Sequence, residues 1–159
     1  MVKLIEKTIS FNSNFGWINA KEINNFIVSI SFGKIEEKYT SKNLNKLKKN
    51  IEEYFSGKNL NYSHKLKIIG SNLQKKIWKE LQKIPYGKTR SYNDIAKKIQ
   101  TSPRYVGNVC AQNNHLLIIP CHRVIRSDGK LGGFSGLGGV NLKQRLLDLE
   151  SKNIYNLKK

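Results

Sequence analysis

Apolar positions in the first part of the chain follow the two-residue period of β-strands. Three short runs rich in β-branched and aromatic side chains cover residues 2–9, 15–20 and 26–32, and turns that contain Asn, Ser or Gly separate them. In the third run apolar residues alternate with serines from Val28 to Phe32, as in a half-buried strand. The pattern predicts a small β-sheet.

The period then changes to that of a helix. Apolar residues recur at helical spacing over residues 44–55, and Gly57 follows as a stop signal. Residues 58–70 are polar and irregular, so we place a domain boundary there. The expected parts are an N-terminal α/β domain, residues 1–68, and a mostly helical C-terminal domain, residues 69–159.

The C-terminal part contains several helix start signals. Ser71 begins a capping box, Ser91 opens a second helix, and Ser102 followed by Pro103 caps a third. The tight connection at residues 100–101 suggests a helix-turn-helix. Short helices joined by tight turns are also common in all-α domains, so this signal alone leaves DNA binding open.

A continuous apolar run at residues 116–119 predicts a buried strand or core segment, and it leads directly to Cys121. A glycine-dense loop follows at residues 129–139, and the last helix carries Leu142 and Leu149 on one face. Glycines permit close backbone approach or unusual dihedral angles. The backbone of this loop could therefore read a flat polar base, or the loop could be a mobile surface segment.

The charge of the chain favours a polyanionic partner. Its 29 Lys and Arg against 11 Asp and Glu give a formal charge of +18. Residues 1–70 have a net charge of +6 and residues 71–159 a net charge of +12. Nucleic acid is the first candidate and an anionic membrane surface the second, while solubility is the plain alternative. We expect the DNA contact in the second half, with an affinity that falls as salt rises.

The two cysteines, Cys110 and Cys121, form neither a C-x-x-C pair nor a disulfide framework. No signal peptide or membrane-length apolar run is seen, so we expect a cytoplasmic protein with reduced thiols and no membrane association. A thiolate at Cys121 would need a nearby imidazole, and His122 is its neighbour. A buried structural cysteine beside an incidental histidine is the alternative.

Further motifs stand in order around this cysteine, at residues 84–89, 91–92, 102–104, 106–107, 113, 118–125, 127–129, 132–136 and 146–150. Together they resemble the active-site signature of the O6-alkylguanine-DNA alkyltransferase family. The resemblance covers about residues 71–150 well. For residues 1–70 it rests mainly on order, size and the stretch at residues 54–58.

The resemblance implies chemical roles for five residues. Cys121 would accept the alkyl group in an in-line displacement at the alkyl carbon. His122 would act through a water as the base for the thiol, and Glu150 would hold the imidazole. Tyr92 would donate its hydroxyl hydrogen to the purine ring as guanine leaves. Asn113 would tie the helix-turn-helix to the cysteine loop.

It also implies contacts with DNA and the base. Arg104 would enter the duplex and fill the gap left by an extruded nucleotide. Ser135 would present a backbone donor towards O6, and the carbonyl of Val124 would accept from the exocyclic amine. Ser102 and Gly136 would lie at the same surface. The resemblance places the helix-turn-helix in the minor groove.

The fold and activity implied are those of a DNA-repair protein. The expected fold is α/β, with a small ribonuclease-H-like N-terminal domain and a mostly helical winged-helix-like C-terminal domain. The expected reaction is an irreversible, stoichiometric transfer from O6-alkylguanine, and O4-alkylthymine is a second candidate substrate. We expect a monomer that acts on double-stranded DNA. No cofactor is expected, because the alkyl group arrives on the substrate, and no metal, because residues 1–70 contain no Cys/His cluster.

The chain departs from the family pattern in three places. Phe134 stands where many relatives have a tyrosine, so any hydroxyl contact there is lost. Asn114 and Leu116 replace prolines that often follow the hinge asparagine. The glycine loop at residues 136–139 is longer than usual, which weakens the alignment of Glu150.

Three other classes of protein are weighed against this interpretation. A non-catalytic alkyltransferase-like lesion binder usually has tryptophan in place of the cysteine, so Cys121 argues against it. A cysteine hydrolase for small molecules does not explain the basic second half or the context of Arg104. A plain helix-turn-helix regulator explains the charge but not residues 120–124.

Overall fold

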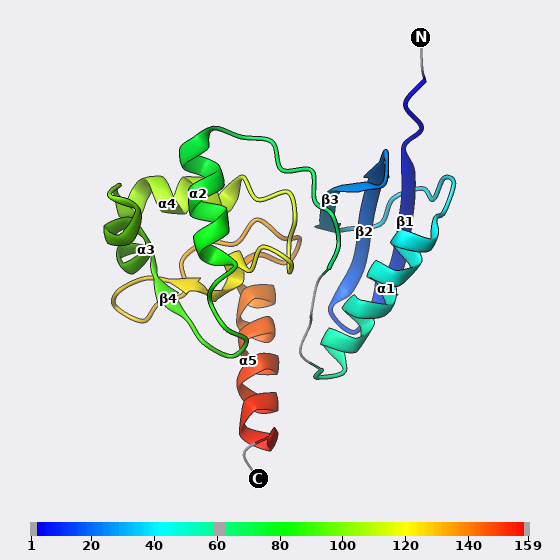
Figure 1. Cartoon of the computed structure of the whole chain (residues 1–159). Helices are drawn as coiled ribbons and strands as arrows, with labels where there is room; N and C mark the ends of the chain where they lie inside the picture. The colour runs from blue at the N-terminus through cyan, green and yellow to red at the C-terminus, as the bar shows by residue number, and fades with distance from the viewer. Residues whose placement is uncertain (1–2, 59–62, 158–159) are drawn as a thin grey trace. The chain divides into compact units, whose positions relative to one another are not determined.

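The computed structural model describes residues 3–58 and 63–157. The chain divides into two compact units, Met1–Ile68 and Ile69–Lys159. Figure 1 shows the strands β1 to β3 and the helix α1 in the first unit, and the other helices in the second. No helix in the described part of the chain is both long enough and apolar enough to cross a membrane.

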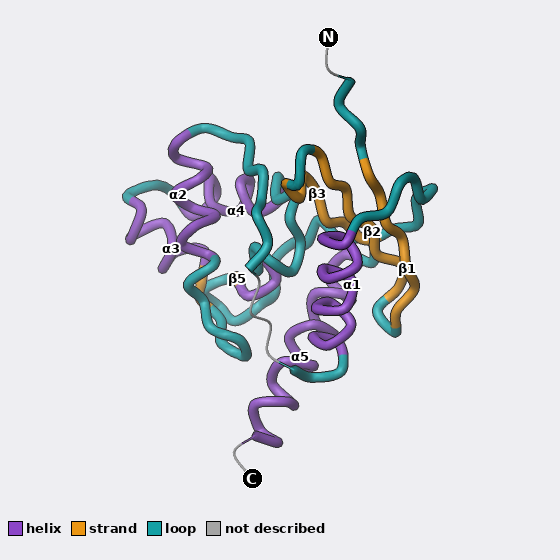
Figure 2. Tube along the Cα trace, turned by 45° about the vertical axis from the view of Figure 1, so that its right-hand side comes forward, coloured by secondary structure: helices purple, strands orange, loops and turns teal. Residues whose placement is uncertain are grey.

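The first unit is an antiparallel three-stranded sheet packed against one helix. Strands β1 (Lys7–Ser13), β2 (Gly16–Ile23) and β3 (Phe26–Phe32) follow one another in sheet order. Helix α1 (Lys42–Phe55) contacts β1 and β2 through its apolar face (Figure 2). The predicted alternation holds only in the second half of β3, where Ile30 and Phe32 are buried. In the first half Ile27 is buried in place of Val28, because the pairing with β2 shifts register between Lys21 and Glu22.

The first two strands begin later than the sequence predicted. Of the predicted strand at residues 2–9, residue 2 lies outside the described residues and residues 3–6 form no strand. The antiparallel register pairs Lys7 with Glu22 and Ser13 with Gly16. Pairing with β2 therefore determines where β1 begins and ends. The strand β1 extends through Phe11 and Asn12, which the apolar pattern did not include.

A partly buried chain of polar side chains links α1 to the segment that follows it. The Nδ2 of Asn50 donates to Nε2 of His64 at 2.9 Å, and Nδ1 of His64 lies 3.2 Å from Oδ1 of Asn43. The Nδ2 of Asn43 donates to Oε2 of Glu22 at 2.7 Å. Because Nε2 accepts a hydrogen bond, this arrangement requires the neutral imidazole.

We expect the first unit to lose stability as the pH falls below about 6.5, the ordinary pKa of histidine. Burial, helped by the charge of Lys46, lowers the pKa of His64 in the folded state. The unfolded chain then binds more protons than the folded one, so stability rises with pH through this window and is lost below it. Denaturant melts at pH 5 and pH 7.5 measure the effect. The His64→Gln variant should show a smaller difference between the two pH values, and an unchanged difference would contradict the assignment.

The second unit follows the predicted helix starts. Its first three helices are α2 (Asn72–Leu81), α3 (Tyr92–Ile99) and α4 (Pro103–Ala111). Ser71 and Ser91 each form a complete capping box, and the Ser102 hydroxyl accepts from the Tyr105 N–H at 3.1 Å. The three cap predictions are confirmed.

The predicted tight turn between α3 and α4 is also confirmed. Gln100 has a left-handed backbone (φ 63°), and the Thr101 N–H donates to the Ala96 carbonyl at 2.9 Å. Helix α2 packs against both helices, and its Trp78 Nε1 donates to the Val109 carbonyl at 3.1 Å. The turn and the packing of α2 together hold the exposed start of α4 in place.

Residues 116–119 are a core segment but not a strand. All four are buried, and Leu116 and Ile119 form only an isolated bridge with each other. The Ile119 N–H donates to the His115 carbonyl at 2.9 Å, and Leu117 has a φ of 74°. Of the two predicted alternatives, the buried core segment is confirmed and the strand is not, because the segment closes on itself. It leads into Cys121 through a tight turn.

The rest of the second unit frames this turn. The short strands β4 (Arg90–Ser91) and β5 (Val124–Ile125) pair in parallel. Between them in the chain lies the 3₁₀ helix η1 (Cys121–Arg123), and the final helix is α5 (Gly139–Leu157). Helix α5 contacts η1, which brings the end of the chain to the cysteine segment.

Candidate active site

Cys121 lies in the wall of a small cavity. The side chain is 4% exposed, at the first position of η1. The cavity has a volume of about 180 Å³, and its lining includes Tyr92, Cys110, Cys121, Phe134 and Ser135. Three of the residues singled out in the sequence, Tyr92, Cys121 and Ser135, are thus brought together from α3, η1 and the glycine loop.

Asn113 connects the helix-turn-helix to the cysteine. Its Nδ2 donates to the Ile119 carbonyl at 2.8 Å and to Sγ of Cys121 at 3.2 Å. Its Oδ1 accepts from the His115 N–H at 2.8 Å, and its own N–H donates to the Cys110 carbonyl at 3.2 Å. Through its backbone N–H and its side-chain amide, Asn113 therefore contacts the end of α4, the core segment and the thiol.

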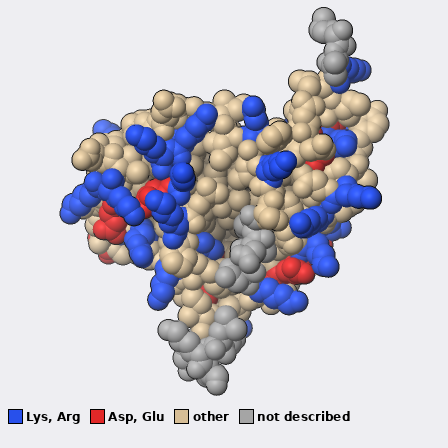
Figure 3. All heavy atoms as spheres, in the orientation of Figure 1, with Lys and Arg blue, Asp and Glu red and all other residues tan. Residues whose placement is uncertain are grey.

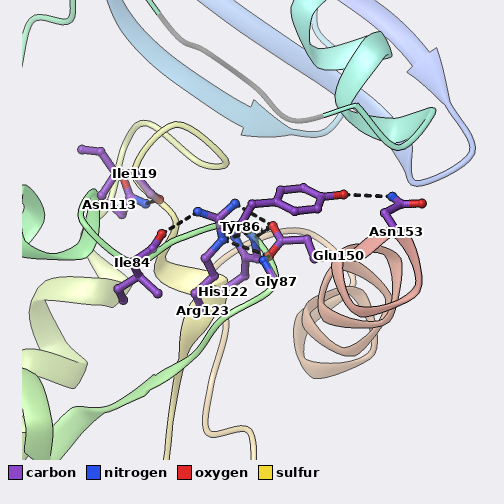
Figure 4. Close-up of polar contacts among 9 residues, drawn as sticks. All are labelled: Ile84, Tyr86, Gly87, Asn113, Ile119, His122, Arg123, Glu150 and Asn153. Atoms are coloured by element: carbon purple, nitrogen blue, oxygen red, sulfur yellow. Dashed lines mark hydrogen bonds and ion pairs between the residues drawn. The ribbon is translucent and has the colours of Figure 1, made fainter. Parts of the chain in front are cut away.

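A second buried network surrounds the carboxylate of Glu150 and includes His122, the residue after Cys121 (Figure 4). His122 and Glu150 are both 0% exposed, and Nε2 of His122 lies 2.8 Å from Oε1 of Glu150. Arg123 grips the same carboxylate through Nε and Nη2 at 2.8–3.1 Å, and its Nη1 donates to the Ile84 carbonyl at 2.9 Å. The Gly87 N–H donates to Oε2 of Glu150 at 3.0 Å.

This network brings η1, α5 and the turn at residues 84–87 to one carboxylate. The sequence pointed to the His122–Glu150 pair, and the structure places the two side chains in contact. The sequence did not point to Arg123, which supplies the positive charge on this carboxylate. Gly87 has a φ of 75°, and a Cβ there would lie 1.9 Å from Cδ1 of Ile154. A larger residue would need this left-handed backbone and a shift of the Ile154 side chain, so glycine is favoured at this turn.

The pKa shifts at the site favour a protonated thiol on Cys121 and a neutral imidazole on His122. Burial raises the pKa of Cys121, against the hydrogen bond from Asn113 and the charge of Lys143. Burial also lowers the pKa of His122, although Glu150 opposes this. At neutral pH the imidazole can then accept a proton, and the thiol requires such a base.

The carboxylate that orients the imidazole remains charged. Burial alone would raise the pKa of Glu150, but the hydrogen bonds and charges of His122 and Arg123 outweigh it and lower the pKa to about 2. A neutral His122 that donates from Nε2 to this carboxylate keeps a lone pair on Nδ1. That tautomer is inferred from the hydrogen-bond partners.

The hydroxyl and the second thiol of the cavity keep their protons. Burial raises the pKa of Tyr92 to about 12, and the charges of Cys110 and Cys121 act in the same direction. Burial likewise raises the pKa of Cys110 to about 12. Tyr92 can therefore donate a hydrogen bond throughout the neutral range, and Cys110 is a poor nucleophile there.

The remaining residues from the sequence lie around the cavity. The exposed Arg104 occupies the second position of α4, and the Ser102 side chain is used in capping that helix. The buried Gly136 follows Ser135 in the glycine loop. The Val124 carbonyl accepts from Nζ of Lys143 at 2.6 Å, which uses one of its two lone pairs.

Lys143 is a site residue that the sequence did not reveal. It is 0% exposed on α5, and its Nζ donates to carbonyls of Val124, Leu131 and Gly133 and to the Tyr92 hydroxyl. Lysine is almost never fully buried unless it is paired, so a sequence gives little reason to place one in a core. The sequence offered one indication of its burial: Lys143 lies next to Leu142 and three residues before Leu146, and both of these leucines are buried.

Comparison with known proteins identifies the family of the chain. A family model described as "6-O-methylguanine DNA methyltransferase, DNA binding domain" matches residues 72–152. The methylated-DNA–protein-cysteine methyltransferase of Sulfolobus acidocaldarius is 36% identical over 149 residues, 92% of this chain and 94% of that protein. The protein of the same name from Methanosarcina barkeri is 46% identical over 106 residues, 65% of this chain and 66% of that protein.

Solved structures share the fold. The crystal structure of Mycobacterium tuberculosis OGT in complex with DNA superposes with a TM-score of 0.80 and 30% identity, over 92% of this chain and 93% of that one. The M. tuberculosis O6-methylguanine methyltransferase gives a TM-score of 0.80 and 29% identity, over 94% of each chain. The mixed α/β architecture with small sheets is therefore common to them.

Proposed function

The chain belongs to the methylated-DNA–protein-cysteine methyltransferase family, and on that premise we propose that Cys121 is the acceptor to which it transfers alkyl groups from O6-alkylguanine in DNA. The observation that carries the assignment is the cavity that holds Cys121 beside Tyr92 and Ser135. It combines a nucleophile, a proton donor and a backbone donor in one small enclosed space. Cys110 shares the cavity, but burial keeps its thiol protonated.

The thiolate arises through the network around Glu150. His122 takes the thiol proton through a bridging water, and Glu150 and Arg123 hold the imidazole in place. The carboxylate then compensates the imidazolium that forms. Asn113 donates to Sγ and stabilises the thiolate further.

The transfer is a displacement at the alkyl carbon. The Cys121 thiolate attacks that carbon, the carbon–O6 bond breaks, and its electron pair passes to guanine. Tyr92 supplies a proton to the purine ring nitrogen, while the Ser135 N–H and the Val124 carbonyl orient the base. The product is a thioether, so each protein molecule repairs one lesion and the reaction is stoichiometric and irreversible.

DNA binding belongs to the second unit. We assign residues 69–159 to a winged-helix-like domain that carries both the DNA contact and the chemistry, and residues 1–68 to a ribonuclease-H-like domain. The start of α4 brings Arg104 and Ser102 to the duplex, and the base is flipped into the cavity because an enclosed thiol cannot reach O6 in the stack. Lys and Arg side chains are spread over the face shown in Figure 3, with few acidic ones among them.

The partner is double-stranded DNA with O6-alkylguanine, and O4-alkylthymine is a further candidate lesion. We propose that the protein acts as a monomer in the cytoplasm, without a cofactor, because the alkyl group arrives on the substrate. A hydrolase would instead release the group, and a lesion binder would leave it on the DNA.

Incubation with duplex DNA containing O6-methylguanine should add one methyl group to Cys121 and none to Cys110. Burial raises the pKa of both thiols, but Cys121 has His122 as its neighbour and accepts a hydrogen bond from Asn113. Peptide mass spectrometry after proteolysis measures both sites, and Cys121→Ser and Cys110→Ser are the matched variants. Folded protein that leaves Cys121 unmodified with excess lesion would refute the proposal.

A further inference from the structure

The cavity contains a second thiol that the proposed chemistry does not use. Cys110 lines it from α4, on the same helical face as Gly107 and Ala111. Cys121 lines it from η1, and both thiols are buried and free. The chain has no other cysteine, so a reaction between two thiols of one molecule must take place in this cavity.

Contacts and charge place the two thiols close to each other. Asn113 bridges them, because its N–H donates to the Cys110 carbonyl at 3.2 Å and its Nδ2 donates to Sγ of Cys121 at 3.2 Å. The cavity that they share has a volume of only about 180 Å³. The charge of a Cys121 thiolate also raises the pKa of Cys110. An oxidised Cys121 would therefore have a second thiol within its own cavity.

Cys121 is open to oxidation for the same reasons that suit it to alkyl transfer. The neutral imidazole of His122 can accept its proton, and Asn113 donates a hydrogen bond to its sulfur. The thiolate that results reacts with peroxides as well as with alkyl carbons. Hydrogen peroxide is far smaller than a purine base, so a cavity that admits the base also admits the peroxide. Oxidation beyond the sulfenic acid gives a sulfinic acid, which ends the use of Cys121 as an acceptor.

We propose that Cys110 is the resolving thiol of Cys121, so that oxidation by hydrogen peroxide closes a reversible disulfide across the cavity. The Cys121 sulfur attacks one peroxide oxygen, the O–O bond breaks, and the products are a sulfenic acid and water. The Cys110 sulfur then attacks the sulfenic sulfur, the S–O bond breaks, and hydroxide leaves with the Cys110 proton as water. The two thiols lose two electrons, the peroxide is reduced to two waters, and no alkylated DNA is required.

Differences between the two thiols determine their order of reaction. Cys121 has an imidazole neighbour and an N–H donor at its sulfur, so it is oxidised first. Burial and the charge of Cys121 raise the pKa of Cys110 to about 12, which keeps Cys110 in the unreactive thiol form. The contribution of that charge disappears when Cys121 becomes a neutral sulfenic acid. The two sulfurs then share one enclosed space, which gives their reaction a high effective concentration.

The disulfide would block the site and protect the acceptor at the same time. A disulfide holds its two Cβ atoms about 3.8 Å apart, so it would draw the two cavity walls together and exclude a base. A dithiol reductant restores both thiols, whereas a sulfinic acid is not recovered in this way. An oxidised molecule would thus be paused, and its single acceptor would remain usable after reduction.

Peptide mass spectrometry tests the disulfide directly. Trypsin leaves both cysteines in one peptide, residues 105–123, because no Lys or Arg lies between Arg104 and Arg123. After peroxide treatment without DNA and alkylation of free thiols, we expect this peptide to be unalkylated and two hydrogens lighter than its dithiol form. Dithiothreitol should return both thiols. A sulfinic acid at Cys121 beside a free Cys110 would overturn the proposal, and so would a disulfide that joins two protein molecules on a non-reducing gel.

Recovery of methyl transfer tests the protection. Each protein receives the same peroxide dose and then dithiothreitol, and its activity is expressed relative to the same protein before oxidation. We expect the wild type to recover roughly tenfold more activity than Cys110→Ala, which has no thiol to stop further oxidation of Cys121. Cys110→Ser is closer to cysteine in size and should behave like Cys110→Ala, since a hydroxyl cannot form the disulfide.

Equal recovery by the wild type and both variants would overturn the protective role. Thermal melts establish that each variant is folded at the assay temperature, and the normalisation removes any effect of the substitutions on the unoxidised rate. If the wild-type protein transfers no methyl group even before oxidation, the proposed function fails. The peptide masses still decide whether the disulfide forms, so the two failures are distinguishable.

Discussion

Replacing Glu150 with alanine should destabilise the second unit by about 3 to 5 kcal/mol, the usual cost of removing one partner of a buried ion pair. The carboxylate accepts from His122, from Arg123 and from the Gly87 N–H. Its loss leaves the mostly buried Arg123 without its counter-charge. It also frees α5 from the turn at residues 84–87, so the variant should be a weak alkyl acceptor as well.

The stability of the second unit should depend on pH through the same network of Glu150, His122 and Arg123. The pKa of Glu150 is lowered from 4.5 to about 2, so its contribution is fully present above pH 4.5 and is lost as the pH falls towards 2. The shift corresponds to on the order of 3 kcal/mol, which agrees with the cost expected for the substitution. At neutral pH the full contribution is therefore present.

Denaturant unfolding at pH 7 and pH 3 measures both effects. Asp148→Ala, an exposed carboxylate on the same helix, is the matched control and should change stability by less than about 0.5 kcal/mol. Glu150→Gln keeps the shape without the charge, and it should fall between the wild type and Glu150→Ala. A Glu150→Ala variant as stable as Asp148→Ala would show that the network does not hold the unit together.

The sequence predicted best what local chemistry determines. A serine cap needs only a side chain and a backbone N–H three residues away, and Ser71, Ser91 and Ser102 all form such caps. Helix α1 likewise follows from its periodic apolar face. Strand limits were less accurate, because pairing with β2 rather than the apolar pattern determines where β1 begins.

Long-range polar contacts were the hardest to predict. Residues 116–119 have the composition of a buried strand, but they lack a partner strand and instead close on themselves. Arg123 and Lys143 carry charges that a sequence places on the surface by default. Their buried partners lie 27 residues away at Glu150 and 51 residues away at Tyr92, and only the folded chain brings them together.

The structure also shows how the site accommodates the three departures from the family pattern. The longer glycine loop does not displace Glu150, since the carboxylate still reaches His122 at 2.8 Å. Asn114 and Leu116, in place of prolines, do not loosen the approach to Cys121, because the Asn113 side chain pins both His115 and Ile119. Phe134 retains a place in the cavity wall as a ring.

Replacing Arg104 with alanine should slow repair of duplex DNA by roughly 100-fold and leave reaction with free O6-benzylguanine within about twofold of wild type. Flipping a base out of a duplex costs a few kcal/mol, and a side chain that fills the gap offsets part of that cost. Arg104 is exposed at the second position of α4 and is absent from the cavity lining. It should therefore act on the duplex and not on the chemistry.

Single-turnover rates on three substrates test this role: a duplex with O6-methylguanine, the same strand alone, and free O6-benzylguanine. The single strand requires no duplex opening, so Arg104→Ala should react with it nearly as fast as the wild type. Arg145→Ala, on the exposed side of α5, controls for the loss of one positive charge and should affect duplex and single strand to the same small extent. Only a rate loss confined to the duplex identifies a residue that replaces the flipped nucleotide. If Arg104→Ala slows the reaction equally on all three substrates, Arg104 instead helps to maintain the cavity.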